Sequence, residues 1–369
     1  MNLTLSLRTL ACALLFTAGL AAAQTIKAVP VARGLQNPWS LAFLPDGRML
    51  VTERPGRMRI VERNGKLGAP LAGLPAVVAS GQGGLLDVVP DPQFVGNQLI
   101  YWSYSEAGDG AVGTAVARGK LDTQNHRITD VQVIFRQLPK VAGGNHFGSR
   151  LAFARDGRLF IGLGDRFTHK DSAQTLDNHL GKIVRIEADG RVAADNPFAG
   201  QSGARHEIWS YGHRNIQGLA IHPTTGELWA TEHGPQGGDE LNAIERGRNH
   251  GWPVITHGRN YGSGTKIGEG TSRADVVAPL RTWVPISIAP SGLAFVTSDR
   301  YPGWQGSLLL GALRGQALIR LELDGHKVVK EQLLLTELKE RIRDVRQGPD
   351  GFVYVLTDNA DGQILRLER

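Results

Sequence analysis

One hairpin pattern recurs along this chain, and it constrains the fold more than any other feature. Each copy is a short apolar run, a turn and a second apolar run, as in residues 41–52, where Asp-Gly forms the turn. Apolar runs of this length with turn residues between them are typical of antiparallel β-hairpins. The copies lie at residues 41–52, 86–102, 151–162, 219–231, 293–310 and 345–356.

The spacing of the copies indicates how the hairpins assemble. Successive copies begin about 45 residues or more apart, and most are followed by further strand-like runs, such as residues 58–61. Four strands per repeat at this spacing are typical of propeller blades. We therefore predict an all-β fold, a single six-bladed β-propeller of four-stranded antiparallel blades over residues 24–369. Residues 26–31 are expected to add a strand to the last blade. The alternative, a pair of β-sandwiches, would not repeat one hairpin six times.

The N-terminal segment predicts export. Arg8 precedes an apolar run at residues 10–20, and three alanines end at Ala23. This is the pattern of a secretory signal peptide over residues 1–23, cleaved near Ala23, and it is too short for a membrane span. A retained anchor is the alternative. No other run is long and apolar enough to span a membrane, so we expect no span in the mature chain.

Cysteine usage and charge narrow the class of protein. The one cysteine, Cys12, lies in the predicted signal peptide, so a mature chain without disulfides is expected, as in periplasmic or secreted bacterial proteins. The net charge is +6, but the basic residues are scattered, which argues against nucleic-acid binding and suits small anionic ligands. The chain has no G-x-S-x-G, P-loop or H-E-x-x-H motif, which counts against serine hydrolases, nucleoside triphosphatases and zinc proteases.

The repeat also predicts where a functional site would lie. The residues that precede each first strand and follow each second strand share one face near the propeller axis, while the Asp-Gly turns lie on the other face. Polar residues concentrate at the first set of positions, which favours a site at that mouth over a merely wet channel. These residues are Gln82, Asn145, His146, Asp165, Arg214, Asn215, His233, Gly234, Pro235, Trp283, Arg314, Arg341 and Arg343.

The arginines of this set indicate a small polyanionic ligand. Arg214, Arg314, Arg341 and Arg343 outnumber the nearby carboxylates, and guanidinium groups pair bidentately with carboxylate or phosphate. Arg341 and Arg343 stand two residues apart, so on an extended strand they point the same way. Any single arginine could equally be a solvated surface residue.

His146 is the candidate base of the set. It lies in the glycine-rich run Gly-Gly-Asn-His-Phe-Gly at residues 143–148, where a ligand can approach closely. Its ordinary pKa near 6.5 allows an imidazole to accept a proton at neutral pH. A structural role is the alternative for a lone histidine.

A hard cation is a further possibility at Gly234 and Pro235. The carbonyl groups of this bend, with Asp239 and Glu240 shortly after them, offer only oxygen ligands, which suit Ca²⁺. The alternative is an ordinary acidic turn.

Several motifs in order resemble one known family. Residues 143–150 (GGNHFGSR), 212–218 (GHRNIQG), 232–240 (EHGPQGGDE), 249–253 (NHGWP) and 343–351 (RDVRQGPDG) are similar to the soluble aldose sugar dehydrogenases that depend on pyrroloquinoline quinone (PQQ). Glucose and sorbosone dehydrogenases of this type share the pattern. The resemblance covers residues 29–367, and the family fold is a six-bladed propeller.

The resemblance implies a reaction. His146 falls on the general base that takes the proton of the sugar C1 hydroxyl, and hydride passes from C1 to the C5 carbonyl carbon of the quinone, leaving a lactone. Arg214 falls on the residue that polarises this carbonyl. The electrons then pass to an acceptor that the sequence does not identify, a quinone or a cytochrome.

The resemblance, taken together with the positions of residues in the repeat and after the Gly-Pro bend, gives the remaining expected site residues. The expected cofactor contacts are Asn215, His233, Arg314, Arg341 and Arg343. The expected substrate contacts are Gln82, Asn145 and Trp283. The expected ligands of a Ca²⁺ beside the quinone are Gly234, Pro235 and Glu240, and this ion would act as a Lewis acid.

Three residues depart from the pattern of the glucose dehydrogenases. Asn145 replaces an aspartate before the base, Arg314 replaces a lysine, and His233 replaces a glutamine. The chain also lacks a long insertion after Gly-Trp-Pro, so a broad aldose preference is expected rather than glucose alone. A calcium-dependent propeller lactonase and a non-catalytic binding propeller are the alternative functions. The first would need a carboxylate-rich metal funnel, and the second would not need His146.

Overall fold

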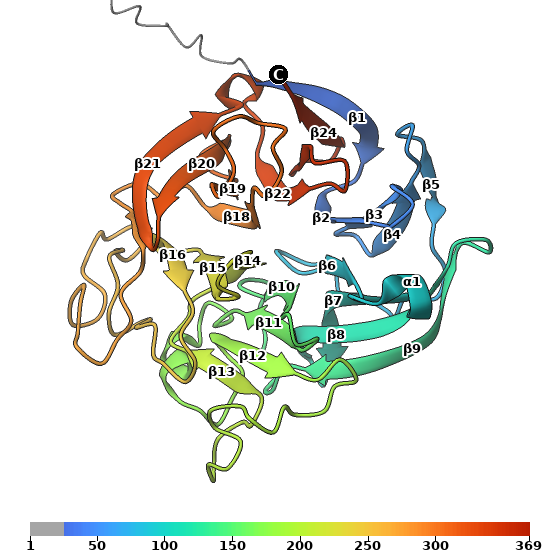
Figure 1. Ribbon diagram of the computed structural model, residues 1–369. Coiled ribbons are helices and arrows are strands. Elements are labelled where there is room, and N and C mark those ends of the chain that lie inside the picture. The colour runs from blue at the N-terminus through green and yellow to red at the C-terminus, as the bar shows by residue number, and fades with distance from the viewer. Residues whose placement is uncertain (1–25) are drawn as a thin grey trace, which may run out of the picture.

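A computed structural model describes residues 26–369, and these form a six-bladed β-propeller (Figure 1). Six separate antiparallel sheets of four strands surround a central axis, which confirms the predicted fold. The predicted signal peptide, residues 1–23, lies outside the described residues. None of the helices within residues 26–369 has the length and apolar character that crossing a membrane requires.

The blades follow one another along the chain, and the first strand of each blade is the innermost. The first three blades are β2 (Pro38–Phe43), β3 (Met49–Glu53), β4 (Arg57–Val61) and β5 (Leu67–Pro70); β6 (Leu85–Pro90), β7 (Leu99–Gly108), β8 (Ala111–Asp122) and β9 (Arg127–Arg136); and β10 (Gly148–Phe153), β11 (Leu159–Leu163), β12 (Lys182–Ile186) and β13 (Ile208–Tyr211).

The last three blades continue the same order. They are β14 (Ile216–Ile221), β15 (Leu228–Glu232), β16 (Asp239–Ala243) and β17 (Arg281–Trp283); β18 (Pro290–Phe295), β19 (Leu308–Ala312), β20 (Ala317–Asp324) and β21 (Lys327–Leu334); and β22 (Ile342–Gln347), β23 (Val353–Thr357), β24 (Gly362–Glu368) and β1 (Lys27–Leu35). The short helices are α1 (Phe94–Asn97), η1 (Lys170–Gln174) and η2 (Thr336–Leu338).

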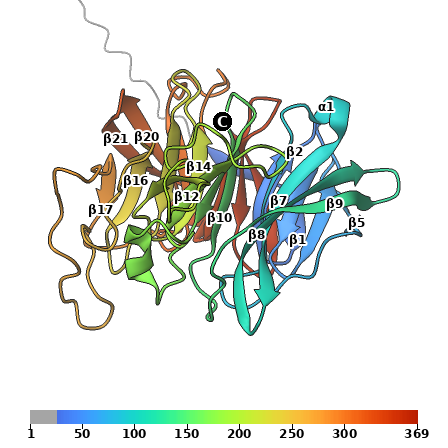
Figure 2. The same ribbon diagram turned by 90° about the horizontal axis from the view of Figure 1, so that it is seen from below.

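The recurring hairpins form the two inner strands of every blade. Each pairs in antiparallel register, for example Leu41 with Val51 in β2 and β3. The expected closure is also present, because β1 pairs with β24 and so joins the start of the chain to its end. Seen from the side, connections project beyond the strands, and the segment between β16 and β17 forms the long loops at the edge of the disc (Figure 2).

Apolar side chains fill the space between neighbouring blades. One cluster packs Tyr101 and Val116 of the second blade against Leu151 and Ile161 of the third, all of them buried. Residues on alternate positions of each strand therefore face the next blade, as the period of a β-strand requires. This packing holds the inner strand ends at fixed positions around the axis.

A buried ion network crosses the axis. Arg150 of the third blade donates from Nη1 to Asp87 of the second blade (3.2 Å) and to Asp344 of the sixth (3.1 Å). Arg346 donates to the same two carboxylates (3.1 and 2.9 Å). The Arg150 Nε group also donates to the main-chain carbonyl of Gln217 (2.9 Å). The network links four blades at the axis, next to Gln217.

Candidate active site

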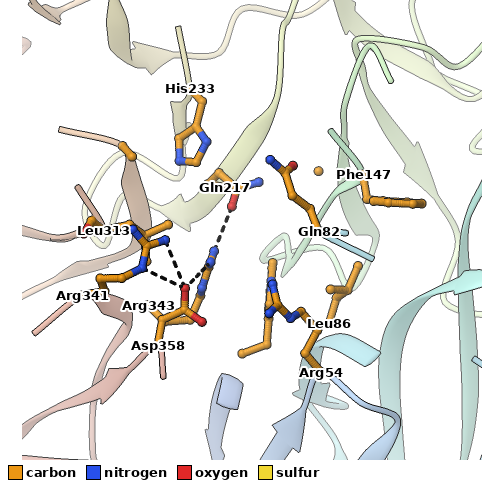
Figure 3. Close-up of a pocket in the computed structure, with 13 residues that line it drawn as sticks. Arg54, Gln82, Leu86, Phe147, Gln217, His233, Leu313, Arg341, Arg343 and Asp358 are labelled. Carbon is orange, nitrogen blue, oxygen red and sulfur yellow. Dashed lines mark hydrogen bonds and ion pairs between the residues drawn. The ribbon is translucent and has the colours of Figure 1, made fainter. Parts of the chain in front are cut away.

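A pocket of about 270 Å³ opens at the axis, on the face where the first strands begin (Figure 3). Every blade contributes to its wall, through residues at the inner strand ends. This is the face that the repeat predicted. The lining residues are Trp39, Arg54, Gln82, Leu86, Phe147, Gly148, Gln217, His233, Ala289, Leu313, Arg341, Arg343 and Asp358.

His146 stands beside this pocket with one ring nitrogen tied to a carboxylate. Its Nδ1 lies 2.6 Å from Oδ1 of Asp165, and its backbone N–H donates to the side chain of Gln82 (2.8 Å). Because a carboxylate accepts, Nδ1 carries the proton and Nε2 is the basic nitrogen. Burial lowers the pKa of His146 below its usual 6.5 despite the opposing effect of Asp165. The imidazole is therefore neutral near pH 7 and able to accept a proton.

Asp165 binds three donors and orients the base. Besides His146, its Oδ1 accepts the backbone N–H of Phe167 (2.8 Å), and its Oδ2 accepts the indole N–H of Trp252 (2.7 Å). Burial opposes ionisation, but the hydrogen bond and charge of His146, and the charge of Arg214, lower the pKa of Asp165. The sequence placed Asp165 at the mouth but did not predict that it pairs with His146.

The two residues after Asp165 hold the loop that carries the base. Arg166 and Phe167 have positive φ values of 57° and 69°, a region that non-glycine residues rarely adopt and that is common at functional sites. Arg166 donates to the carbonyl of Gly143 (2.5 Å) and to that of Asn145, and its guanidinium lies 3.6 Å over the ring of Phe147. Burial lowers the pKa of Arg166 to about 10. Neither residue was predicted, and their position directly after Asp165 was the available signal.

The partly exposed side chain of Phe167 packs against the ring of His146. Its ring meets that of His146 edge to face, with centroids 5.1 Å apart, and the side chain remains 45% exposed. The exposed ring therefore borders the space in front of the imidazole.

The opposite wall of the pocket is cationic. Arg343 donates to Gln217 (3.1 Å) and to Asp358 (2.9 Å), and Arg341 lies 3.3 Å from Asp358 (Figure 3). Arg54 lines the same pocket, so three guanidinium groups surround the one carboxylate among the lining residues of the described chain. Burial opposes ionisation of Asp358, but Arg343 and Arg341 lower its pKa. Burial also lowers the pKa of Arg54.

Arg214 lies between the base and the Gly234 bend. Its Nη1 donates to the carbonyls of His233 (3.0 Å) and Gly234 (2.5 Å), and its guanidinium lies 5.2 Å from the ring of Trp252. The Nε2 atom of His233 lies 2.8 Å from the Pro290 carbonyl. Burial lowers the pKa of His233 to about 3, so this ring is neutral.

The side chain of Asn215 holds the backbone that follows the base. Its Oδ1 accepts the N–H of Gly148 (3.1 Å), two residues after His146. Within residues 26–369, its amide nitrogen has no hydrogen-bond partner although it is buried. A buried donor without a partner is costly, so Asn215 retains capacity for a ligand.

The predicted calcium ligands form an oxygen-rich region. Both carboxylate oxygens of Asp239 already accept hydrogen bonds from the backbone, from the N–H groups of Gly234 (2.8 Å) and Ile288 (2.7 Å). Glu240 is buried near Glu232, and burial followed by the charge of Glu232 raises its pKa. No cluster of three histidine, cysteine or acidic side chains suited to a metal occurs in the described part of the chain. A cation here would therefore depend on backbone carbonyls.

Of the predicted residues, Gln82, His233, Arg341 and Arg343 line the pocket itself, and Trp283, Arg314 and Asn145 are among those that do not. Trp283 ends β17, the outermost strand of its blade, and its indole N–H donates to Glu331 on β21 (3.2 Å). The expectation that Trp283 borders the channel is wrong, because six residues (284–289) separate it from the first strand of the next blade. Arg314 is exposed on the turn between β19 and β20, and Asn145 is also exposed.

Known proteins are similar to this chain along nearly its whole length. The family model described as Glucose / Sorbosone dehydrogenase matches residues 35–366. The chain belongs to the glucose/sorbosone dehydrogenase family. Aldose sugar dehydrogenase YliI of Escherichia coli (strain K12) is 48% identical over 353 residues, which cover 94% of each protein.

Solved structures place this glucose/sorbosone dehydrogenase family member among the same enzymes. The crystal structure of the soluble aldose sugar dehydrogenase from Escherichia coli in the apo-form superimposes with a TM-score of 0.90 at 47% identity, covering 93% of this chain and 99% of that one. The PQQ-bound form of aldose sugar dehydrogenase from Streptomyces coelicolor has a TM-score of 0.79 at 31% identity, with 93% and 98% covered. The predicted family and its enzymatic class are confirmed.

Proposed function

We propose that this dehydrogenase oxidises aldose sugars at C1 to lactones, with PQQ as the hydride acceptor, Ca²⁺ beside the quinone and His146 as general base. The observation that carries the proposal is a neutral, buried imidazole beside a pocket that is lined by three arginines. A group that can accept a proton thus lies next to a pocket that can bind a ligand with several negative charges. The family's aldose dehydrogenases, one of them described in a PQQ-bound form, support this reading. We expect a broad aldose preference.

The pocket fits PQQ by charge. PQQ carries three carboxylates, and Arg54, Arg341 and Arg343 exceed the single Asp358 in the wall. The buried Nε atom of Arg343 is without a partner in the described structure, so it has a donor left for an incoming anion. Asn215, His233 and Arg314 are our further proposed contacts.

The region of Gly234 and Pro235 fits a calcium ion by the chemistry of its donors. Carbonyl and carboxylate oxygens suit Ca²⁺, and Glu240 lies buried beside a second carboxylate, an arrangement that a cation would relieve. The buried Oδ1 atom of Asn242 also lacks a partner among the described residues. When bound, the quinone and its calcium would supply a two-electron acceptor activated by a Lewis acid.

Side chains of the protein would bind the sugar, accept its proton and polarise the cofactor. Gln82 and Asn145 would hold the sugar in front of His146, whose Nε2 takes the proton of the C1 hydroxyl. Asp165 would then stabilise the imidazolium through Nδ1, as a carboxylate partner does for a catalytic histidine. Arg214 would polarise the cofactor carbonyl. Burial of these groups strengthens each electrostatic contact.

We further propose that residues 24–369 act as one catalytic domain in the periplasm or outside the cell, after removal of residues 1–23. The basis is the signal-peptide pattern and the absence of cysteine after residue 12. The electrons would leave for a quinone or a cytochrome.

Reconstitution tests the proposed function. The apo-protein is incubated with PQQ and Ca²⁺, a spectrum is recorded, and glucose or another aldose is added. We expect the band of the oxidised quinone to bleach and one lactone to form for each quinone reduced. A spectrum that no aldose in a broad panel changes would overturn the proposal and favour a lactonase or a binding protein.

A further inference from the structure

The indole of Trp252 donates to the carboxylate that orients His146. Its Nε1 lies 2.7 Å from Oδ2 of Asp165, while Oδ1 of the same carboxylate lies 2.6 Å from His146. Trp252 is 7% exposed and Asp165 is fully buried. The bond joins residues 87 positions apart, so a loop of the fourth blade reaches the base of the third.

The backbone around Trp252 is held on both sides. Its N–H donates to the carbonyl of Gly212 (2.9 Å), and its carbonyl accepts the side-chain amide of Gln174 (2.7 Å). Gln174 in turn accepts from the amide of Asn249 (2.8 Å). These bonds hold the backbone at Trp252, from which the indole reaches Asp165.

Other tryptophans of the chain show that burial alone does not demand such a bond. The indole N–H groups of Trp102 and Trp209 are buried, and within the described residues neither has a partner. Trp252 differs in that its N–H meets an ionised carboxylate, a charge-assisted bond of greater strength.

We propose that Trp252 is a positioning residue, which fixes Asp165 and shares its negative charge so that His146 stays a neutral, correctly turned base. The inference rests on the proposed role of His146. A carboxylate holds each donor less strongly as further donors are added, so Trp252 weakens the attraction of Asp165 for the imidazole proton. Without the indole N–H, Asp165 would favour the protonated imidazole more strongly.

The other charged groups around His146 do not depend on this contact. Arg214 and Arg166 both disfavour its protonation, and His233 is neutral. Arg214 also lies over the Trp252 ring, which a phenylalanine would preserve as an aromatic face. Trp252→Phe therefore removes the N–H from Asp165 and leaves these charges in place.

The test is an NMR titration of histidine side chains in the apo-protein, with His146 assigned by its loss in His146→Ala. In Trp252→Phe we expect the midpoint of His146 to move to higher pH by about half a unit to one unit, a change of about three- to tenfold in proton affinity. The acid limb of kcat/KM in the reconstituted enzyme should move in the same direction. An unchanged midpoint would overturn the proposal.

Two controls separate positioning from general loss of packing. Trp102→Phe removes the same volume from the core but no bond to a carboxylate, because the buried Trp102 indole N–H has no partner among the described residues, and it should leave the His146 midpoint where it is. In an Asp165→Asn background, Trp252→Phe should cause no further shift, because the effect passes through Asp165. A shift that persists in that background contradicts the inference.

The wild-type protein gives an independent measurement should Trp252→Phe fail to fold. With ¹⁵N-labelled tryptophan, the indole signal of Trp252 should move with the titration of His146, and that of the buried, unpartnered Trp102 should not. A Trp252 signal that ignores this titration overturns the inference. These readouts need no turnover, so they remain decisive even if His146→Ala were to keep full activity and the proposed function were to fail.

Discussion

Arg343 donates to Asp358 at 2.9 Å, and Asp358 is the single acidic side chain that lines the central pocket in the described structure. The Nη2 group of Arg343 thus donates to Asp358 and the Nη1 group donates to Gln217. The Nε group is buried and has no hydrogen-bond partner among the described residues. The residue is held in place by the protein yet retains a donor. Such a fixed guanidinium is pre-organised for an anion, because little side-chain freedom remains to be lost on binding.

Arg343→Ala should weaken PQQ binding by about 2–5 kcal/mol, since one partner of a buried charged contact is removed. Arg343→Lys should restore only part of the affinity, because a point charge cannot replace a planar fork. Titration of the apo-protein with PQQ, followed by recovery of activity and by fluorescence, measures both. Asp358→Asn is the matched control, since it removes negative charge from the same wall and should not weaken binding. Equal dissociation constants for wild type and Arg343→Ala would show that the cluster does not hold the cofactor.

Arg166→Met should lower turnover about tenfold while leaving PQQ affinity near that of the wild type. Arg166 ties down the carbonyls of Gly143 and Asn145, and hydrogen bonds from a charged donor contribute about 1.5–3 kcal/mol each. Loss of these bonds would loosen the loop that carries His146.

A surface arginine with similar contacts serves as the control for Arg166. Arg300 also lies over a phenylalanine ring (4.7 Å) and donates to a backbone carbonyl (3.1 Å), but it is exposed and lies among the turns of the opposite face. Arg300→Met should leave kcat unchanged. Steady-state kinetics of the two variants, with equal loss in both, would contradict the assignment of Arg166 to the loop.

Removal of calcium should abolish activity reversibly. The Gly234 and Pro235 bend with Glu240 offers oxygen donors, and burial and the charge of Glu232 raise the pKa of Glu240, an effect that a bound cation would counter. Holoenzyme is treated with a chelator, assayed, and assayed again after Ca²⁺ is returned, with metal content measured at each step. Full activity in protein shown to be free of metal would exclude the ion from the mechanism.

The fold was accessible from the sequence because each blade repeats one local pattern. The hairpin of residues 151–162, for example, has its own turn and its own apolar alternation, so it is readable without knowledge of its neighbours. Propeller geometry then converts position within a repeat into position on a face. That rule correctly brought Gln82, His233, Arg341 and Arg343 to one pocket.

The position of a residue within its repeat also points to two pocket residues that the sequence analysis did not name. Arg54 follows β3 and Asp358 follows β23, so both stand directly after a second strand and both line the pocket. Trp283 was misplaced for the opposite reason, because it closes an outer strand and a loop of six residues separates it from β18. Among these three, a residue lines the pocket when it lies directly next to an inner strand in the sequence, and not when a loop separates it from that strand.

Contacts between loops could not be predicted in this way. Trp252 lies in an insertion after the third strand of its blade, and its bond to Asp165 depends on how that insertion folds back to the axis. Repeats constrain only the strands and their immediate ends. Side chains that come from insertions are positioned by tertiary contacts such as the Gln174–Asn249 pair.

The pH dependence of the reaction should follow the neutral form of His146. Burial lowers its pKa in the folded protein below 6.5, so the base is competent at neutral pH and is lost only as the pH falls through that lowered value. We expect kcat/KM to be flat above pH 6.5 and to decline below it. A profile measured across pH 4 to 8, with reversibility checked after each exposure, tests this, and an acid limb centred above pH 6.5 would contradict it.

His146→Ala should lose about 10²- to 10⁴-fold in kcat, the usual contribution of a general base, while PQQ still binds. The reason is geometric, because His146 stands outside the arginine wall and contacts Asp165 and Gln82 rather than Arg341 or Arg343. The acid limb of the pH profile should disappear in this variant, since the group that titrates is gone. Rapid mixing of the reconstituted variant with an aldose measures the rate of quinone reduction directly, apart from the later transfer of electrons to an acceptor. A variant that reduces the quinone at the wild-type rate would remove His146 from the mechanism and leave Asp165 and Trp252 without a base to orient.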